Sequence, residues 1–205
     1  ISYSIDEEKK TAEAIGYDQS SSYVTIPSTI TIDGKVYSVV SIGKSAFDSS
    51  DKLLEVTIED GVEEIKKYAF YYCRYLRKVK LPATLKSIGL WAFWKSLSLS
   101  SIYIPASLTD LSAEAFTEGG MSAYEVSPDN PVYSSEDGIM FNKEKTELLH
   151  FPAKKQVESY SIPKTVEKIG KFAFESNQLN EVIFHDKLLT IDDYAFFLCL
   201  LFAKA

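Results

Sequence analysis

Histidine and cysteine are scarce in this chain, with two of each among its 205 residues. His150 precedes Phe151 and Pro152, and His185 lies in a later unit of the repeat described below. Neither histidine belongs to a recognisable nucleophile, metal or phosphate motif, and the many carboxylates are scattered along the chain. We therefore expect no catalytic residue, no metal site and no cofactor, and we predict that the protein is not an enzyme.

An excess of basic residues and a long hydrophobic run are also missing. The formal net charge is −7, which argues against a nucleic-acid partner, because basic patches usually hold nucleic acids. No run reaches the roughly 18 apolar residues of a membrane-spanning helix. The first residue is Ile1 rather than methionine, so we expect a mature or trimmed product whose signal peptide lies outside this sequence.

What the chain does contain is a repeated apolar pattern. Its clearest unit spans residues 76–93, and the same offsets recur in the unit before it and in the unit after it; the apolar positions are Leu76, Val79, Leu81, Leu85, Ile88, Ala92 and Phe93. An Ala-Phe pair closes each unit, at Phe47, Phe70, Phe93, Phe116, Phe174 and Phe196, with spacings of 23, 23, 23, 58 and 22 residues. A fixed period of about 20–29 residues with Leu or Ile at set offsets indicates a leucine-rich-repeat solenoid.

The physics of one unit follows from its residues. The segment Val79-Lys80-Leu81 alternates apolar and polar residues, as a half-buried strand does, and Pro82 ends it. Ile88-Gly89 then turns the chain back, and Ala92-Phe93 fills the interior from the opposite wall. One such coil cannot bury its apolar face alone, so we expect coils that stack and contact mainly their neighbours.

The pattern L-x-x-V-x-I-P-x-x-V-x-x-I-G-x-x-A-F resembles the BspA-like, or treponemal-type, class of leucine-rich repeats, from about Tyr23 to Phe196. We expect an α/β leucine-rich-repeat solenoid, horseshoe-like, in which a β-dominated right-handed coil carries β-hairpin insertions. The resemblance implies a protein that is secreted by, or displayed on, anaerobic host-associated bacteria. It also implies a role in adhesion and protein binding.

We expect a single domain over residues 1–205. It comprises an N-terminal β cap (1–22), repeats 1–4 (23–118), a β-hairpin insertion (119–156), and repeats 5–6 (157–205), the last one truncated. Asp33-Gly34 predicts a second hairpin over residues 30–37, inside the first repeat. In the insertion, strands are expected at residues 124–126, 138–142 and 147–151. The apolar end, which includes Leu200 and Phe202, lacks a polar cap, so we expect self-association through this end.

The cysteines have a structural explanation. Cys73 and Cys199 each lie three residues after a repeat phenylalanine, in a slot that small or polar residues occupy elsewhere. Several coils, at about 4.8 Å each, separate them, which is far beyond the roughly 7 Å limit for a disulfide. No third cysteine or nearby histidine completes a metal-ligand set. We therefore predict two free thiols.

The concave strand face is the first candidate binding surface, because solenoids of this kind usually bind partners there. Glu55 is expected to lie beside Lys78 on the neighbouring strand, and such pairs contribute roughly 0.2–1 kcal/mol. The face is therefore either a self-compensated solvated surface or a mixed polar groove in which Tyr103 anchors a protein partner. The outward positions are Glu55, Thr57, Lys78, Lys80, Ser101, Tyr103, Ser159, Ser161, Glu181 and Ile183.

The second candidate is a group of aromatic residues around the Ala-Phe pairs. The repeat spacing stacks Tyr68 on Trp91 and Tyr71 on Trp94 in neighbouring coils; the full set is Tyr68, Tyr71, Tyr72, Tyr75, Trp91 and Trp94. The group is either an exposed protein interface or sugar platform, or simply coil-to-coil packing worth about 0.5–1.5 kcal/mol per pair.

These observations predict a non-catalytic extracellular or cell-surface recognition module that binds a protein, as adhesion requires. Two alternatives remain open. One is a carbohydrate-binding surface built on Trp91 and Trp94. The other is a structural spacer that carries further domains.

Overall fold

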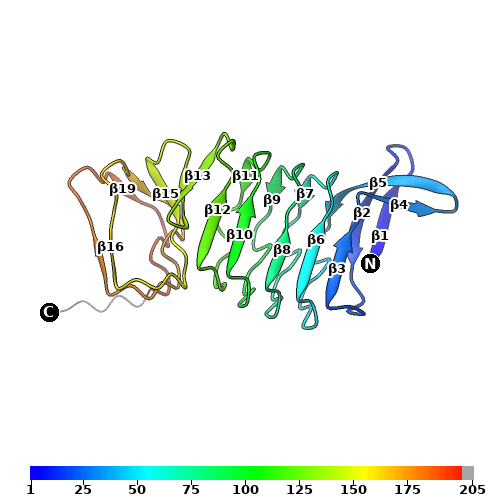
Figure 1. Ribbon diagram of the computed structural model, residues 1–205, viewed down its shortest axis with the longest axis horizontal. Coiled ribbons are helices and arrows are strands. Elements are labelled where there is room, and N and C mark those ends of the chain that lie inside the picture. The colour runs from blue at the N-terminus through cyan, green and yellow to red at the C-terminus, as the bar shows by residue number, and fades with distance from the viewer. Residues whose placement is uncertain (200–205) are drawn as a thin grey trace.

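The computed structural model describes residues 1–199, and it contains strands and turns but no helix in that range. The coils follow one another along the long axis, from the N-terminal strands at one end to the last coils, with β16 and β19, at the other (Figure 1). The predicted solenoid is confirmed, whereas the expected α/β class is wrong. Within the described range, no helix is long and apolar enough to cross a membrane. The predicted C-terminal contact at Leu200 and Phe202 lies outside the described residues.

The longer strands form one wall of the solenoid. β3 (Tyr23–Ile26), β6 (Glu55–Ile58) and β8 (Lys78–Lys80) pair in parallel, as do β10 (Ser101–Ile104) with β12 (Ala123–Val126) and β16 (Ser159–Ser161) with β18 (Glu181–Ile183). Val56 and Ile58 point inward and are buried, while Glu55 and Thr57 remain partly exposed between them. β8 ends at Lys80, so the expected third strand residue, Leu81, follows the strand and is partly buried against the core.

A second wall consists of very short strands. β7 (Glu64–Ile65), β9 (Ser87–Ile88) and β11 (Asp110–Leu111) continue a sheet that begins with the N-terminal strands, and β17 (Lys168–Ile169) and β19 (Thr190–Ile191) continue a sheet that begins with the insertion. Gly89 follows one of these strands. A Cβ atom there would lie 2.8 Å from the Lys67 backbone nitrogen, so glycine allows the coils to approach closely.

The third wall explains why the return segment is not a helix. The backbone adopts positive φ two residues before and two residues after the repeat phenylalanine, for example φ 63° at Tyr68 and 59° at Tyr72 around Phe70. A helix needs uninterrupted right-handed residues, and these left-handed residues prevent it. Amide groups bond to the next coil instead: the Tyr72 N–H donates to the Trp94 carbonyl over 2.7 Å.

At the N-terminal end, β1 (Ser2–Asp6) pairs antiparallel with β2 (Thr11–Gly16), and β2 pairs in parallel with β5 (Lys35–Ile42). The predicted first-repeat hairpin is confirmed, because β4 (Thr29–Ile32) pairs antiparallel with β5. Its turn residues, Asp33 and Gly34, have φ of 50° and 74°, the signs that a tight hairpin turn requires.

The insertion supplies strands to the coil stack. β13 (Tyr133–Glu136), β14 (Ile139–Asn142) and β15 (Glu147–His150) form an antiparallel sheet, and β15 pairs in parallel with β17. The three expected strands are present, and β13 is an additional strand that was not predicted. The Phe151 N–H donates to the Ala173 carbonyl over 2.7 Å, as the Phe93 N–H does to the Ala115 carbonyl over 2.8 Å. Phe151 therefore takes the position of a repeat phenylalanine.

The core is built around stacked phenylalanines. Rings of adjacent coils lie 4.9–5.2 Å apart in one column, and 5.0–5.1 Å apart in a second one; the first column contains Phe47, Phe70, Phe93 and Phe116, and the second contains Phe151, Phe174 and Phe196. Tyr124 and His150 lie between the columns, with ring centroids 5.5 Å apart. The buried residues accordingly form two hydrophobic clusters that divide at the insertion.

Both cysteines are free, as predicted. The Cys73 thiol is buried and donates to the Phe47 carbonyl over 3.0 Å, while Cys199 is partly exposed. Burial raises the pKa of the Cys73 thiol to about 12, so this thiol stays protonated and acts as a small core residue.

Candidate functional site

The face of the long strands contains a groove of about 670 Å³ over β6, β8 and the side chain of Tyr103 on β10. Among the predicted face residues, Thr57, Lys78, Lys80 and Tyr103 line it, together with Ser28, Glu59 and Asp60. Tyr103 is 49% exposed and is the large aromatic side chain of this groove. The groove thus combines two ammonium groups, two carboxylates and one exposed ring.

The other predicted face residues lie outside the groove. Glu55 pairs in register with Lys78, as expected, although its ion pair is with Arg77 at 3.7 Å. Ser101 faces Ala123 on β12. Ser159 and Ser161 face Glu181 and Ile183 across β16 and β18, a pair of strands separate from β10 and β12. The ten predicted residues are therefore split between two patches of the same face.

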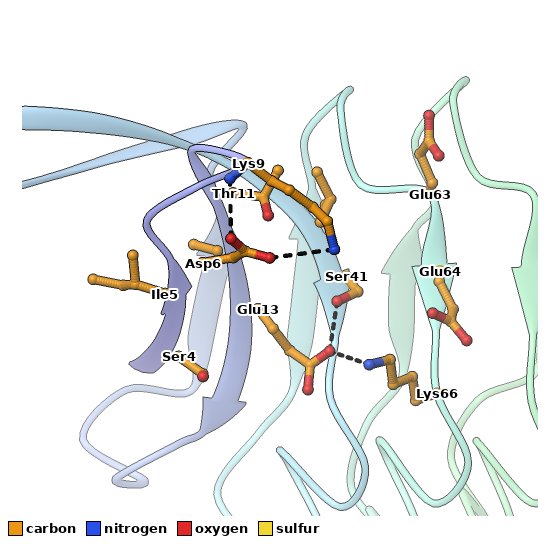
Figure 2. A pocket seen from close by; sticks show the side chains of 12 residues that line it. Ser4, Ile5, Asp6, Lys9, Thr11, Glu13, Ser41, Glu63, Glu64 and Lys66 are labelled. Carbon is orange, nitrogen blue, oxygen red and sulfur yellow. Dashed lines mark hydrogen bonds and ion pairs between the residues drawn. The ribbon is translucent and has the colours of Figure 1, made fainter.

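A polar crevice near the N-terminus was not anticipated from the sequence. Its side chains come from β1, β2, β5 and the segment around β7 (Figure 2). The Glu13 carboxylate accepts a hydrogen bond from the Ser41 hydroxyl over 2.7 Å and pairs with the Lys66 ammonium. Partial burial opposes ionisation of Glu13, but the bonds from Lys66 and Ser41 outweigh it, so its pKa is lowered.

Two further carboxylates of this crevice have ion-pair partners, whereas Glu64 forms no salt bridge within residues 1–199. Asp6 forms an ion pair with Lys9 (Figure 2), with the two atoms 3.3 Å apart, and Glu63 pairs with Lys86 at 2.8 Å. Among residues 1–199, no group of three or more potential ligands could hold a metal ion. Most charges of the crevice are therefore paired within the protein, at the place where the N-terminal strands meet the first coils.

Three of the six predicted aromatic residues line another cavity, of about 340 Å³, which we call the aromatic cleft. Tyr71, Trp91 and Trp94 line it from one side of the insertion in the sequence, and Phe172, Tyr194 and Phe197 line it from the other. Thr117, Glu118 and Glu175 supply its polar side chains. Tyr68, Tyr72 and Tyr75 lie outside its lining.

The coil-to-coil packing of the aromatic residues is also present. The Tyr71 and Trp94 rings stack with centroids 4.6 Å apart and planes 11° apart, and Tyr68 and Trp91 lie 5.6 Å apart at 52°. Tyr72 lies 6.0 Å from Trp94. Trp91 nevertheless remains 36% exposed and Tyr75 53% exposed. The group is both packed between coils and open to solvent at its edge.

One long-range hydrogen bond and one local hydrogen bond hold the Glu175 carboxylate in the cleft. The Glu118 N–H donates to a Glu175 carboxylate oxygen over 2.9 Å, although 57 residues separate them. The other Glu175 oxygen accepts from the Ser176 hydroxyl over 2.5 Å. Glu175 is only 6% exposed, and burial raises the pKa of its carboxyl. Glu118 pairs with Lys95 at 3.2 Å.

The histidines occupy structural positions. His150 is buried beside Tyr124, and this burial lowers its pKa to about 4, so the ring is neutral at physiological pH. A ring nitrogen of His185 lies 2.9 Å from the Pro163 carbonyl oxygen and so spans two coils.

The chain matches the family model described as the BspA type leucine-rich repeat region, in six copies over residues 40–156 and 149–204. No curated protein sequence is significantly similar to it.

Solved bacterial leucine-rich-repeat proteins share the fold. A leucine-rich repeat protein from Eubacterium ventriosum is 25% identical, with a TM-score of 0.66 over 86% of this chain and 51% of that chain. One from Bacteroides capillosus is 32% identical, with a TM-score of 0.57 over 61% of this chain and 92% of that one. A leucine-rich cell surface protein from Faecalibacterium prausnitzii is 21% identical, with a TM-score of 0.55 over 92% of this chain and 70% of that chain. The chain thus spans about half of the Eubacterium protein.

Proposed function

The chain belongs to the BspA-type leucine-rich-repeat family, and from this premise we propose that it is a secreted or cell-surface recognition module that binds a protein through its long-strand face. The observation that carries the proposal is the groove over β6, β8 and β10. It presents Tyr103 as a half-exposed ring, together with Lys78, Lys80 and the carboxylates of Glu59 and Asp60.

This composition favours a protein partner. Interface energy concentrates on a few anchors, with tyrosine among the most frequent, and a polar rim sets orientation. Lys78 and Lys80 are exposed and have no ion-pair partner among residues 1–199. They can therefore meet acidic side chains of a partner without first breaking an internal salt bridge. The strands beneath them are held by ladder hydrogen bonds, so little ordering is needed on binding.

A surface location is part of the same proposal. It draws on the family and on the related structure from Faecalibacterium, which is described as a cell surface protein. The non-catalytic role draws on the family too, since a solenoid of repeated strands offers an extended face rather than a convergent catalytic group. Adhesion to host or other cells is the biological setting we infer.

The carbohydrate alternative depends on free aromatic faces. Trp94 has one face stacked on Tyr71, which leaves Trp91 as the more open indole. The spacer alternative depends on further domains and makes no demand on either surface. A binding experiment separates the three.

The test is a screen of the purified chain against extracellular-matrix proteins and a glycan array, read beside two single variants. Tyr103→Ala removes the anchor of the groove, and Tyr75→Ala removes a tyrosine of similar exposure, 53% against 49%, that does not line the groove. We expect a protein hit that Tyr103→Ala weakens by about tenfold or more and that Tyr75→Ala leaves unchanged. A protein hit indifferent to Tyr103→Ala would reject the groove, and a glycan hit alone would favour the carbohydrate alternative.

A further inference from the structure

The aromatic cleft lies apart from the long-strand groove and shares no lining residue with it. We propose that this cleft is a binding site for an alkylated ammonium group, such as a quaternary ammonium. The proposal does not depend on the function assigned to the groove. It rests on the shape of the cleft, the chemistry of its walls, and the charge of Glu175.

The cleft owes its shape to the break in the repeat. The turns before and after it carry large aromatic residues, Trp91 and Trp94 on one side and Phe172 and Tyr194 on the other. The turn between them carries the smaller Thr117 at the position that Trp94 holds one coil earlier. The hollow therefore has six aromatic side chains and a volume of about 340 Å³, within the range of small-molecule sites.

Aromatic walls attract positive charge. The face of each ring is negative, and tryptophan attracts cations most strongly, within about 6 Å of the ring centroid. The protein already uses this attraction at the two edges of the cluster: the Lys95 ammonium lies 4.3 Å from the Trp94 centroid, and the Lys171 ammonium lies 5.2 Å from that of Phe172. Each of these lysines is held by a carboxylate, Lys95 by Glu118 and Lys171 by Glu114.

Glu175 is the carboxylate of the cleft that has no ion-pair partner at salt-bridge distance within residues 1–199, although the charge of Lys154 favours its ionised form. It lines the cleft, is 6% exposed, and forms no salt bridge within residues 1–199. Its two hydrogen bonds come from neutral donors, the Glu118 N–H and the Ser176 hydroxyl. Burying an ionised carboxylate costs free energy unless it is paired with a cation. A cation bound in the cleft would supply that pairing for Glu175.

The alkylated form of the cation fits better than a primary ammonium. A primary ammonium needs hydrogen-bond acceptors for three N–H groups and is strongly hydrated. The cleft offers few acceptors beyond Glu118, Glu175 and Thr117, while rings make up most of its lining. Methyl groups around the nitrogen replace those donors with apolar contact, which aromatic cages accommodate.

The chain provides its own reporter for the test. It contains two tryptophans, Trp91 and Trp94, and both line the cleft. Their fluorescence is recorded while choline or tetramethylammonium is added at constant ionic strength, with NaCl as the blank. Dimethylbutanol, the uncharged carbon isostere of choline, is titrated in parallel. We expect saturable changes with both cations and binding of the isostere about tenfold weaker or absent.

Two variants test the residues. Glu175→Gln keeps the shape and removes the charge, so it is expected to weaken choline binding by about tenfold while dimethylbutanol is unaffected. If that variant does not fold, Phe197→Ala removes one exposed ring of the cleft instead. It is expected to weaken the binding of both choline and dimethylbutanol. Tyr75→Ala, outside the cleft, is the control and leaves them unchanged.

The outcomes decide the proposal. Equal binding of choline and dimethylbutanol, or no saturation with either cation, overturns it. So does a sugar that saturates the tryptophan signal when the cations do not, because the cleft is then a carbohydrate site. If choline binds, phosphocholine and a trimethyl-lysine peptide distinguish a headgroup source from a protein source, according to which binds tighter than choline itself.

Discussion

Replacing Phe93 by alanine tests the idea that the phenylalanine column holds the coils together. Phe93 is 1% exposed and stacks between two neighbours, 5.1 Å from Phe70 at 6° and 5.2 Å from Phe116 at 9°. Truncating a buried phenylalanine typically costs about 3–5 kcal/mol. The two stacked pairs are each worth about 0.5–1.5 kcal/mol beyond burial, so the upper half of that range is expected.

The position in the column gives an internal comparison. Phe196 is only partly buried and stacks on Phe174 at 5.0 Å, with no further ring of the column beyond it in residues 1–199. Because coils contact mainly their neighbours, Phe196→Ala removes one interface and Phe93→Ala removes two. We expect the cost at Phe196 to be about half of that at Phe93. Leu97→Ala, at a residue 52% exposed, is the neutral control, within about 0.5 kcal/mol of the parent.

The assay is equilibrium unfolding in urea, followed by far-UV circular dichroism and by tryptophan emission. Coincident transitions give the free energy of unfolding from the midpoint and slope. A Phe93→Ala cost below about 1 kcal/mol, or one equal to that of Phe196→Ala, would refute the reasoning. It would mean that the strand ladders, and not the ring column, carry the cohesion between coils.

Three further predictions concern other parts of the molecule. Gly89→Ala is expected to lower the free energy of unfolding in urea by about 1–3 kcal/mol, because its Cβ would lie 2.8 Å from a backbone nitrogen. Gly16→Ala is the control that should be tolerated, because a Cβ there would lie 3.7 Å from the nearest atom, the Ser2 Cβ. Burial lowers the pKa of His150 to about 4, below the unfolded value of 6.5. The stability that the neutral His150 ring contributes is therefore fully present above pH 6.5 and is lost as the pH falls towards 4. His150→Gln should therefore flatten the pH dependence of stability by roughly 3 kcal/mol between about pH 7.5 and pH 4, and an unchanged slope would contradict this. Lys66→Met removes the strongest partner of Glu13, so the Glu13 pKa should rise in a carbon-detected NMR titration. An unchanged Glu13 pKa would show that the hydrogen bond from Ser41 alone keeps it low.

The coil architecture was predictable because each coil is specified locally. The spacing of Ile65, Phe70 and their equivalents places apolar residues on the inside of the coils. The structure buries Ile65 and Phe70 completely, whereas Ile191 of the last coil is 50% exposed. The Asp33-Gly34 turn was predictable for the same reason, since residue type alone selects its backbone angles. The return segment was misjudged because positive φ at bulky residues such as Trp91 and Phe172 leaves no mark in the apolar pattern.

The surfaces were only partly predictable. Alternation along a strand identified Thr57, Lys78, Lys80 and Tyr103 as outward residues, and the structure brings them to one groove. It does not bring Ser159 or Glu181 there, because the insertion strands lie between β12 and β16 along the solenoid (Figure 1). The Glu13–Lys66 pair of the N-terminal crevice joins residues that are 53 positions apart in the sequence, so no short sequence motif predicts it.

By itself, the sequence determined the repeat, the inward residues and the family, because these depend on spacing within one coil and its neighbours. Only the tertiary structure decided that Trp94 and Phe172 line one cleft and that Glu175 is buried in it. The physical reason is the insertion. How its strands fit into the stack sets the distance between the two aromatic groups, and that depends on packing among residues far apart in the chain.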